Sequence, residues 1–105
     1  MQVTVKTVLN KTHPIPGFRY ASVRLVAGPG EVELWGEIEA HVQRRGRCSV
    51  CAQAAATYDH LARREWTHVG VWGLMTRLFY TPRRVSCPEH GVRVEAMPWN
   101  EGKRP

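Results

Sequence analysis

The chain has 105 residues, a formal net charge of +6 and three cysteines. This length allows one domain, or one small domain with an extension, and excludes a multidomain architecture. Three cysteines argue against a disulfide framework, and no apolar run is long enough to span a membrane. The basic charge suits a polyanionic partner such as nucleic acid, although solubility alone would also explain it.

The first half of the chain predicts β-structure. Residues 1–9 alternate weakly between apolar and polar side chains and are expected to form a first strand. Residues 10–18 contain two prolines and a glycine and predict a rigid, extended loop. Residues 19–26 and 31–42 alternate with a period of two on either side of a Gly-Pro-Gly turn, which predicts an antiparallel hairpin.

The outer face of residues 31–42 carries four glutamates beside Trp35, and we expect this face to repel DNA. Gly36 suggests a bulge or bend within the strand. Further on, residues 52–58 predict at most a short helical turn, and residues 65–80 predict two strands with a turn at Gly73. A last short strand is expected over residues 92–96, after which no regular structure is predicted.

Two pairs of metal-binding residues frame the central part of the sequence. Cys48 and Cys51 form the first pair, and Cys87 and His90 form the second. Two residues separate the members of each pair, so that both side chains can reach one ion from a single tight turn. Together they would make a closed Cys₃His tetrahedron around one structural Zn²⁺, and this site would use every cysteine of the chain.

Other chemistries remain open for these side chains. Cys48 and Cys51 could form a redox pair, but Cys87 would then have no partner. Cys87 and His90 could act as nucleophile and base, but no third group is evident to orient the base. Three inert buried cysteines are the remaining alternative.

Residues beside the ligands shape the two turns. Gly91 follows the last ligand, at a place where a left-handed backbone is often needed. Ala52 follows the first pair, where glycine would relax the turn, and backbone strain is expected there. The gap between the pairs is longer than in compact zinc modules, and His60 or His68 could replace a ligand that failed to bind.

These elements predict a mostly β fold, in which an N-terminal β-hairpin is followed by a zinc ribbon with two knuckles on a small antiparallel sheet. We assign residues 1–43 to the hairpin extension and residues 44–99 to the zinc-ribbon domain. Residues 100–105 are assigned to a tail that leads to absent downstream domains. No signal peptide is recognisable, and cysteine pairs in a chain without a leader predict metal binding in the cytoplasm.

The run Cys-Pro-Glu-His-Gly-Val-Arg-Val-Glu-Ala-Met-Pro-Trp at residues 87–99 resembles the zinc-finger signature of bacterial insertion-sequence transposases of the ISL-three family. Residues 47–51 and 58–59 resemble the same region, and residues 8–11 and 16–20 resemble the start of such proteins. The resemblance therefore covers nearly the whole chain.

In this family such a region is the N-terminal zinc-binding domain, followed by a helix-turn-helix and a catalytic domain with three carboxylates. No such triad can be assembled from the present sequence. The resemblance therefore implies a non-catalytic part of a transposase that binds double-stranded DNA at transposon ends, in the bacterial cytoplasm and on the nucleoid when DNA-bound.

Residues 44–93 contain nine arginines, no lysine and three acidic residues. Arginine can hold a phosphate with two hydrogen bonds or read a guanine edge. The predicted DNA contacts are the arginines beside the two knuckles: Arg44, Arg45, Arg47, Arg83 and Arg84. The larger aromatic side chains are expected to fill the core rather than to stack on bases: Trp66, Trp72, Phe79, Tyr80 and Trp99.

A second hypothesis assigns the chain to another functional class. In that reading it is a zinc-stabilised protein-interaction module that forms a homodimer or docks to the catalytic domain without touching DNA. The acidic strand with Trp35 would suit such a role. Salt dependence separates the two hypotheses, because DNA binding weakens steeply as salt rises and apolar association does not.

Overall fold

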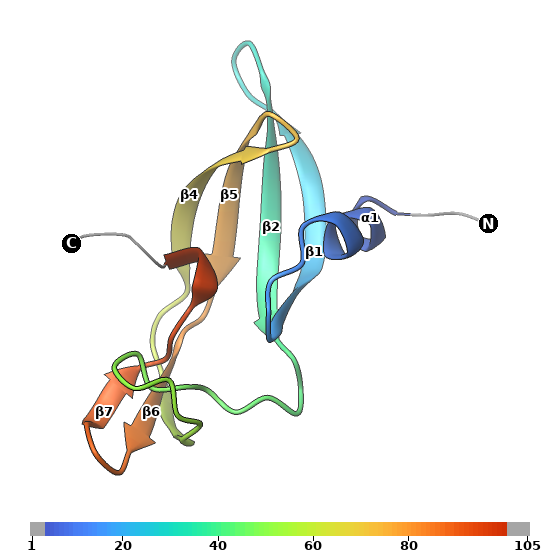
Figure 1. The fold of residues 1–105 in the computed structure, drawn as a ribbon. Helices are drawn as coiled ribbons and strands as arrows, with labels where there is room; N and C mark the ends of the chain where they lie inside the picture. Colours follow the sequence, from blue (N-terminus) through green and yellow to red (C-terminus); the bar gives the residue numbers. More distant parts are fainter. Residues whose placement is uncertain (1–3, 101–105) are drawn as a thin grey trace. The chain divides into compact units, whose positions relative to one another are not determined.

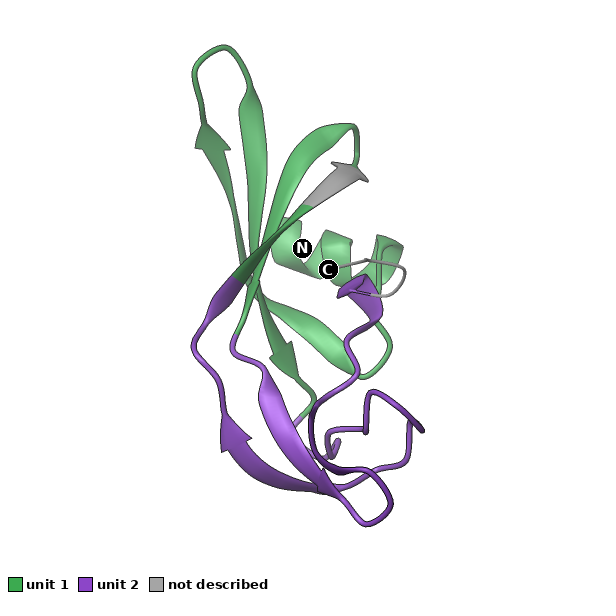
Figure 2. Ribbon diagram, turned by 90° about the vertical axis from the view of Figure 1, so that its left-hand side faces the viewer, with its two compact units in different colours: residues 1–41, 65–80 green, residues 42–64, 81–105 purple. Residues whose placement is uncertain are grey.

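The chain forms two compact units, each built from two stretches of sequence (Figure 2). The structure, a computed structural model, describes residues 4–100 apart from the side chains of residues 68–70. Unit 1 comprises residues 1–41 and 65–80, and unit 2 comprises residues 42–64 and 81–105. Strands predominate in both units, which confirms the predicted mostly β fold. The predicted division of the chain into three consecutive segments stays a prediction.

Unit 1 is a four-stranded sheet with one helix (Figure 1). The predicted hairpin is formed by β1 (Phe18–Ala27) and β2 (Val32–Ala40), which pair antiparallel. A second hairpin is formed by β4 (Arg64–Val71) and β5 (Leu74–Tyr80), with Gly73 in the turn as predicted. The strand order is β1-β2-β5-β4, and β2 pairs with β5 in parallel.

The N-terminal segment is a helix, so the strand expected over residues 1–9 was wrong where the structure describes it. The helix α1 (Val5–Thr12) begins after Thr4, whose hydroxyl accepts a hydrogen bond from the backbone N–H of Thr7 at 3.2 Å. This cap and the burial of Leu9 on one side of the helix outweigh a weak alternation. Within residues 4–100 no helix has the length and apolar character that crossing a membrane requires.

The strand β2 separates a buried face from a charged face, as its alternation predicts. Leu34 is fully buried, whereas Glu33 and Glu39 on the opposite face form ion pairs with Arg77 and Arg19. The Arg77 Nε to Glu33 Oε1 distance is 2.9 Å. Arginines of the same sheet therefore offset part of the predicted acidic face.

The irregularity predicted at Gly36 lies in the neighbouring strand instead. Gly36 pairs in register with Val23, whereas the register of β1 shifts between Tyr20 and Ser22. A β-bulge places an extra residue in one strand of a pair. The bend of this hairpin therefore belongs to β1.

Unit 2 is a three-stranded antiparallel sheet with the order β3-β6-β7. The central strand β6 (Arg83–Cys87) pairs with β3 (Ala56–His60) on one side and with β7 (Gly91–Val94) on the other. The strand β3 corrects the helical turn expected over residues 52–58. Its backbone hydrogen bonds go to β6, a partner that the local sequence does not reveal.

The aromatic side chains expected in the core are buried with one exception. At most 9% of the surface of each of the following side chains is exposed: Trp66, Phe79, Tyr80 and Trp99. Trp72 is the exception, since it lies in the β4–β5 turn and is 44% exposed. Trp99 belongs to a short 3₁₀ helix, η1 (Pro98–Asn100), so regular structure extends further than the sequence predicted.

Candidate metal centre and its surroundings

The first knuckle is a tight turn held by backbone hydrogen bonds. The N–H of Cys48 donates to the carbonyl of Gln53 at 2.9 Å, and the N–H of Ala52 donates to the carbonyl of Cys48 at 2.8 Å. Ala52 has φ = 65°, which confirms the strain expected at this position. A left-handed backbone costs a residue with a Cβ about 1–2 kcal/mol. The turn adopts this conformation despite its cost, and Cys51 thereby lies near Cys48.

The second knuckle is the hairpin loop between β6 and β7. Cys87 ends β6 and pairs with Gly91, the first residue of β7. His90 is the last of the three loop residues, and Gly91 has φ = 73°. The left-handed residue directly follows the three-residue loop, and glycine takes this conformation without steric cost. Gly91 therefore has the role that the sequence predicted.

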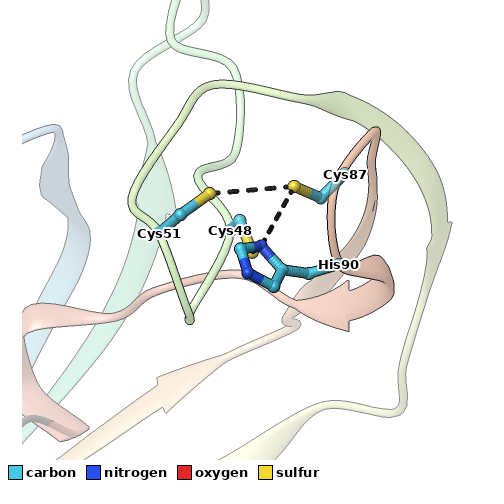
Figure 3. A group of neighbouring side chains, drawn as sticks. All are labelled: Cys48, Cys51, Cys87 and His90. Atoms are coloured by element: carbon cyan, nitrogen blue, oxygen red, sulfur yellow. Dashed lines mark hydrogen bonds between the residues drawn. The ribbon is translucent and has the colours of Figure 1, made fainter.

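All four predicted ligands meet at one point (Figure 3). The Sγ atoms of Cys51 and Cys87 are 3.7 Å apart, and Nδ1 of His90 lies 3.6 Å from Cys87 Sγ and 3.8 Å from Cys48 Sγ. Zn–S bonds of about 2.3 Å and a Zn–N bond of about 2.0 Å give tetrahedral edges of about 3.8 Å for S···S and about 3.5 Å for S···N. The four side chains therefore fit a single structural zinc.

This convergence favours a metal over the other chemistries considered for these residues. None of the three cysteines forms a disulfide, and Cys48 and Cys87 are buried. A redox pair or a cysteine–histidine pair would involve only two of the four side chains. It would not explain why the other two lie beside them. His60 is exposed on β3 and is not in the cluster, and the side chain of His68 lies outside the described residues.

Backbone N–H groups prepare Cys48 to lose its proton. Donation from Cys51 is the largest influence, donation from Val50 adds to it, and together they lower the pKa of the Cys48 thiol to about 7 despite its burial. The N–H of Val50 lies 3.4 Å from the Cys48 sulfur. A metal binds the thiolate form of cysteine, so the fold lowers the cost of deprotonation at this ligand.

Beneath the first knuckle lies a buried ion pair between Arg83 and Glu95. The Arg83 guanidinium donates to Glu95 from Nη2 at 2.9 Å and from Nε at 3.2 Å, and its backbone N–H donates to the same carboxylate at 2.8 Å. Only 1% of the Glu95 side chain is exposed. Arg83 Nη1 also donates to the Arg44 carbonyl at 3.1 Å, and Glu95 forms a backbone bridge with Cys48. This pair therefore joins the first knuckle to β6 and β7.

The backbone before the knuckle packs directly on β6. A Cβ atom on the buried Gly46 would lie 2.7 Å from Val85 Cγ1, closer than such atoms approach in real structures. The N–H of Ala55 donates to the Gly46 carbonyl at 3.0 Å. Glycine at this position therefore lets the chain that enters the metal site lie against the sheet.

Arg84 is also paired with a carboxylate. Its Nε donates to Asp59 Oδ1 at 2.7 Å, and its Nη2 donates to the second carboxylate oxygen. These hydrogen bonds lower the pKa of Asp59. The Arg84 guanidinium also lies over the ring of Tyr58, with 5.3 Å between the guanidinium carbon and the ring centroid.

The other predicted DNA-contacting arginines directly precede Cys48. Arg45 and Arg47 are exposed, and Arg44 is half-buried. Arg47 Nη1 donates to the Ala52 carbonyl at 3.2 Å, so it spans the first knuckle. Sequence reasoning placed these three residues and Arg83 and Arg84 in one functional group. The structure instead gives the last two ion-pair partners within unit 2.

Two residues of the site were missed by the sequence analysis. Glu95 is buried although it is charged and directly follows the short strand β7, and its only sequence signal is its position within the run of residues 87–99. Tyr58 is 59% exposed, more than any other described Phe, Tyr or Trp residue. Its exposure follows from a register shift in β3 that no local pattern announces.

Residues 44–90 match the family described as the zinc-finger of transposase IS204/IS1001/IS1096/IS1165. No curated protein and no solved structure matches the chain. The matched segment contains both knuckles, so the resemblance inferred from the sequence and the geometry of the four ligands agree.

Proposed function

Because residues 44–90 match the zinc-finger family of these transposases, we propose that the chain is a DNA-recognition part of a transposase that binds double-stranded DNA at transposon ends. In this role it positions the DNA and performs no strand transfer by itself. Such a protein works where bacterial DNA lies, in the cytoplasm and on the nucleoid.

The observation that carries the proposal is the surplus of arginine around the metal centre. The described part of unit 2 contains eight arginines and three acidic residues. Asp59 and Glu95 pair with Arg84 and Arg83, and the described residues of unit 2, 42–64 and 81–100, keep a formal surplus of five positive charges when histidine is counted as neutral. A rigid, cationic surface of this kind suits the closely spaced phosphates of duplex DNA.

The exposed arginines lie beside both knuckles. Arg45 and Arg47 precede the first, and Arg93 follows the second and donates from Nε to the His90 carbonyl at 3.0 Å. The zinc ligands fix the backbone from which these side chains extend. We assign phosphate contacts to Arg44, Arg45, Arg47 and Arg93. Arg83 and Arg84 form ion pairs with Glu95 and Asp59, and these ion pairs limit their contact with DNA.

The test is a salt titration of DNA affinity with the zinc-loaded chain and a duplex of about 20 base pairs. The logarithm of the binding constant should fall with the logarithm of salt concentration by about 0.9 for each phosphate contacted, hence by about 3–4 for these arginines. Replacing Arg45 and Arg47 with Gln should reduce the slope by about 2. The matched control is Arg19→Gln, an exposed arginine of unit 1, which should leave the slope unchanged.

A second candidate role is favoured by exposed apolar residues at one end of the unit 1 sheet. Leu25, Val32 and Trp72 are 53%, 42% and 44% exposed. The parallel pairing of β2 with β5 places both hairpin turns at this end. Such a group suits contact with another protein, such as a second copy or the catalytic domain. If binding to DNA does not depend on salt, and sedimentation shows self-association that Leu25→Ser abolishes, this role replaces the first.

A further inference from the structure

The central strand β6 of the unit 2 sheet has one buried side and one exposed side. Val85 and Cys87 of β6 are buried, whereas Ser86 between them is exposed, and so is Val92, its partner on β7. On the other side of β6, Ser86 pairs with the exposed Ala56. The exposed face is therefore continuous across all three strands.

A β-bulge turns Tyr58 toward this exposed face. Thr57 pairs with Val85 and Asp59 pairs with Arg84, so Tyr58 is an extra residue of β3 between two consecutive pairs. A bulge allows neighbouring residues to point to the same side of a sheet. Tyr58 and Asp59 do so here, since both contact the side chain of Arg84.

Arg84 holds the tyrosine ring in place. Two hydrogen bonds from its guanidinium to Asp59 fix its plane, and the guanidinium carbon lies 5.3 Å from the Tyr58 ring centroid. Tyr58 is nevertheless 59% exposed. An aromatic ring that is oriented in advance and remains open to solvent binds a second flat ring with little loss of side-chain entropy.

The charges around this ring favour a base over a phosphate. Asp59 offsets the charge of Arg84, so the immediate surroundings of the ring are close to neutral. Arg45, Arg47 and Arg93 of the same unit suit the phosphates of the same strand. Every base has a π-face that stacks on tyrosine, but inside a duplex both faces are covered by neighbouring bases.

We propose that Tyr58, held by Arg84 and Asp59, stacks on an unpaired DNA base. This inference rests on the proposed DNA binding and adds that the chain prefers DNA whose end or flank is single-stranded. The knuckle arginines supply affinity for any duplex, and Tyr58 supplies the preference for an unpaired base.

The test compares a blunt duplex of about 20 base pairs with the same duplex carrying an unpaired tail of about four nucleotides. With the zinc-loaded full chain, Tyr58→Ala should weaken binding to the tailed DNA by about 5- to 150-fold and change binding to the blunt duplex by less than about twofold. Tyr58→Phe keeps the ring and should bind both like the original chain. Trp72→Ala, which removes an exposed ring from unit 1, should change neither.

A direct readout uses 5-iodouracil at the unpaired position. Irradiation should cross-link this base to Tyr58, as identified by mass spectrometry of the digested complex. Equal affinity of Tyr58→Ala and the original chain for tailed DNA would overturn the stacking inference while leaving duplex binding intact. Loss of affinity for both DNAs to the same extent, with zinc content retained, would also overturn it. If the original chain bound neither DNA, or if Tyr58→Ala altered only self-association in sedimentation, the exposed face would be a protein interface and the inference would be wrong.

Discussion

Replacing Glu95 with Gln should destabilise the protein far more than the same change at an exposed glutamate. Glu95 is buried and accepts hydrogen bonds from three N–H groups of Arg83, one of its backbone and two of its guanidinium. Gln keeps the shape and one acceptor oxygen but removes the negative charge. The Arg83 side chain, which is only 14% exposed, then loses the negative charge of the carboxylate that it contacts.

The expected cost follows from this burial. Removing one member of a buried ion pair costs about 3–5 kcal/mol, because the remaining charge stays out of water. Arg83 retains some exposure and its donation to the Arg44 carbonyl, which places the expected loss near 3 kcal/mol. For a chain of this size, such a loss lowers the melting temperature by about 10–20 °C.

The assay is unfolding of the zinc-loaded chain by urea and by heat, at a fixed free zinc concentration, since bound metal adds to the measured stability. The control is Glu39→Gln, which breaks the exposed pair with Arg19 and should cost less than about 1 kcal/mol. If Glu95→Gln and Glu39→Gln had the same urea midpoint, the structural role of the Arg83–Glu95 pair would be refuted. Arg83 would then return to the group of arginines available to DNA.

Three further predictions concern the metal, the first knuckle and the unit 1 sheet. Removing zinc with a chelator should abolish hydrogen-exchange protection in β3, β6 and β7, because zinc binding contributes on the order of 10 kcal/mol in small zinc modules; retained protection would argue against the site. Ala52→Gly should raise stability by up to about 1 kcal/mol in urea unfolding by relieving the left-handed backbone, whereas Ala54→Gly, at an exposed position without positive φ, should lower it. The pKa of Glu33 is lowered by hydrogen bonds from Trp35 and then from Arg77, so this carboxylate stabilises the fold above its ordinary pKa and less as pH falls through the lowered value. Trp35→Phe should therefore move the NMR titration midpoint of Glu33 upward, and an unchanged midpoint would contradict the assignment.

The features that the sequence predicted correctly are those specified by short stretches of chain. The spacing within each ligand pair, the left-handed backbone at Ala52 and Gly91, and the alternation along β1 and β2 all depend on residues a few positions apart. A turn or a hairpin is formed from such stretches, so its sequence carries most of the information. The metal centre belongs to this class because each knuckle is a local turn.

The features that the sequence did not predict depend on distant partners. The strand β3 exists because β6 pairs with it, and the parallel contact between β2 and β5 joins segments that are far apart in the chain. Arg83 and Arg84 look like DNA contacts until Glu95 and Asp59, 12 and 25 positions away, are placed beside them. The Thr4 side chain caps α1 and favours a helix where the weak alternation of the sequence predicted a strand. A single side-chain hydrogen bond of this kind is easily missed in a sequence pattern.

Zinc binding stabilises unit 2, as the burial of a hydrophobic core stabilises a larger domain. The ligands Cys51 and Cys87 are 36 positions apart, and closing a loop of that length with a covalent cross-link stabilises a fold by about 4 kcal/mol. Between these two ligands the chain leaves unit 2, forms β4 and β5 of unit 1 and then returns. The paired strands β3 and β6 are therefore separated in sequence by residues of unit 1. The buried side chains of unit 2 are few, and Cys48 and Cys87 are two of them. The arginines beside the knuckles are therefore oriented by the metal, and under the proposed function DNA affinity should follow zinc occupancy rather than the integrity of unit 1.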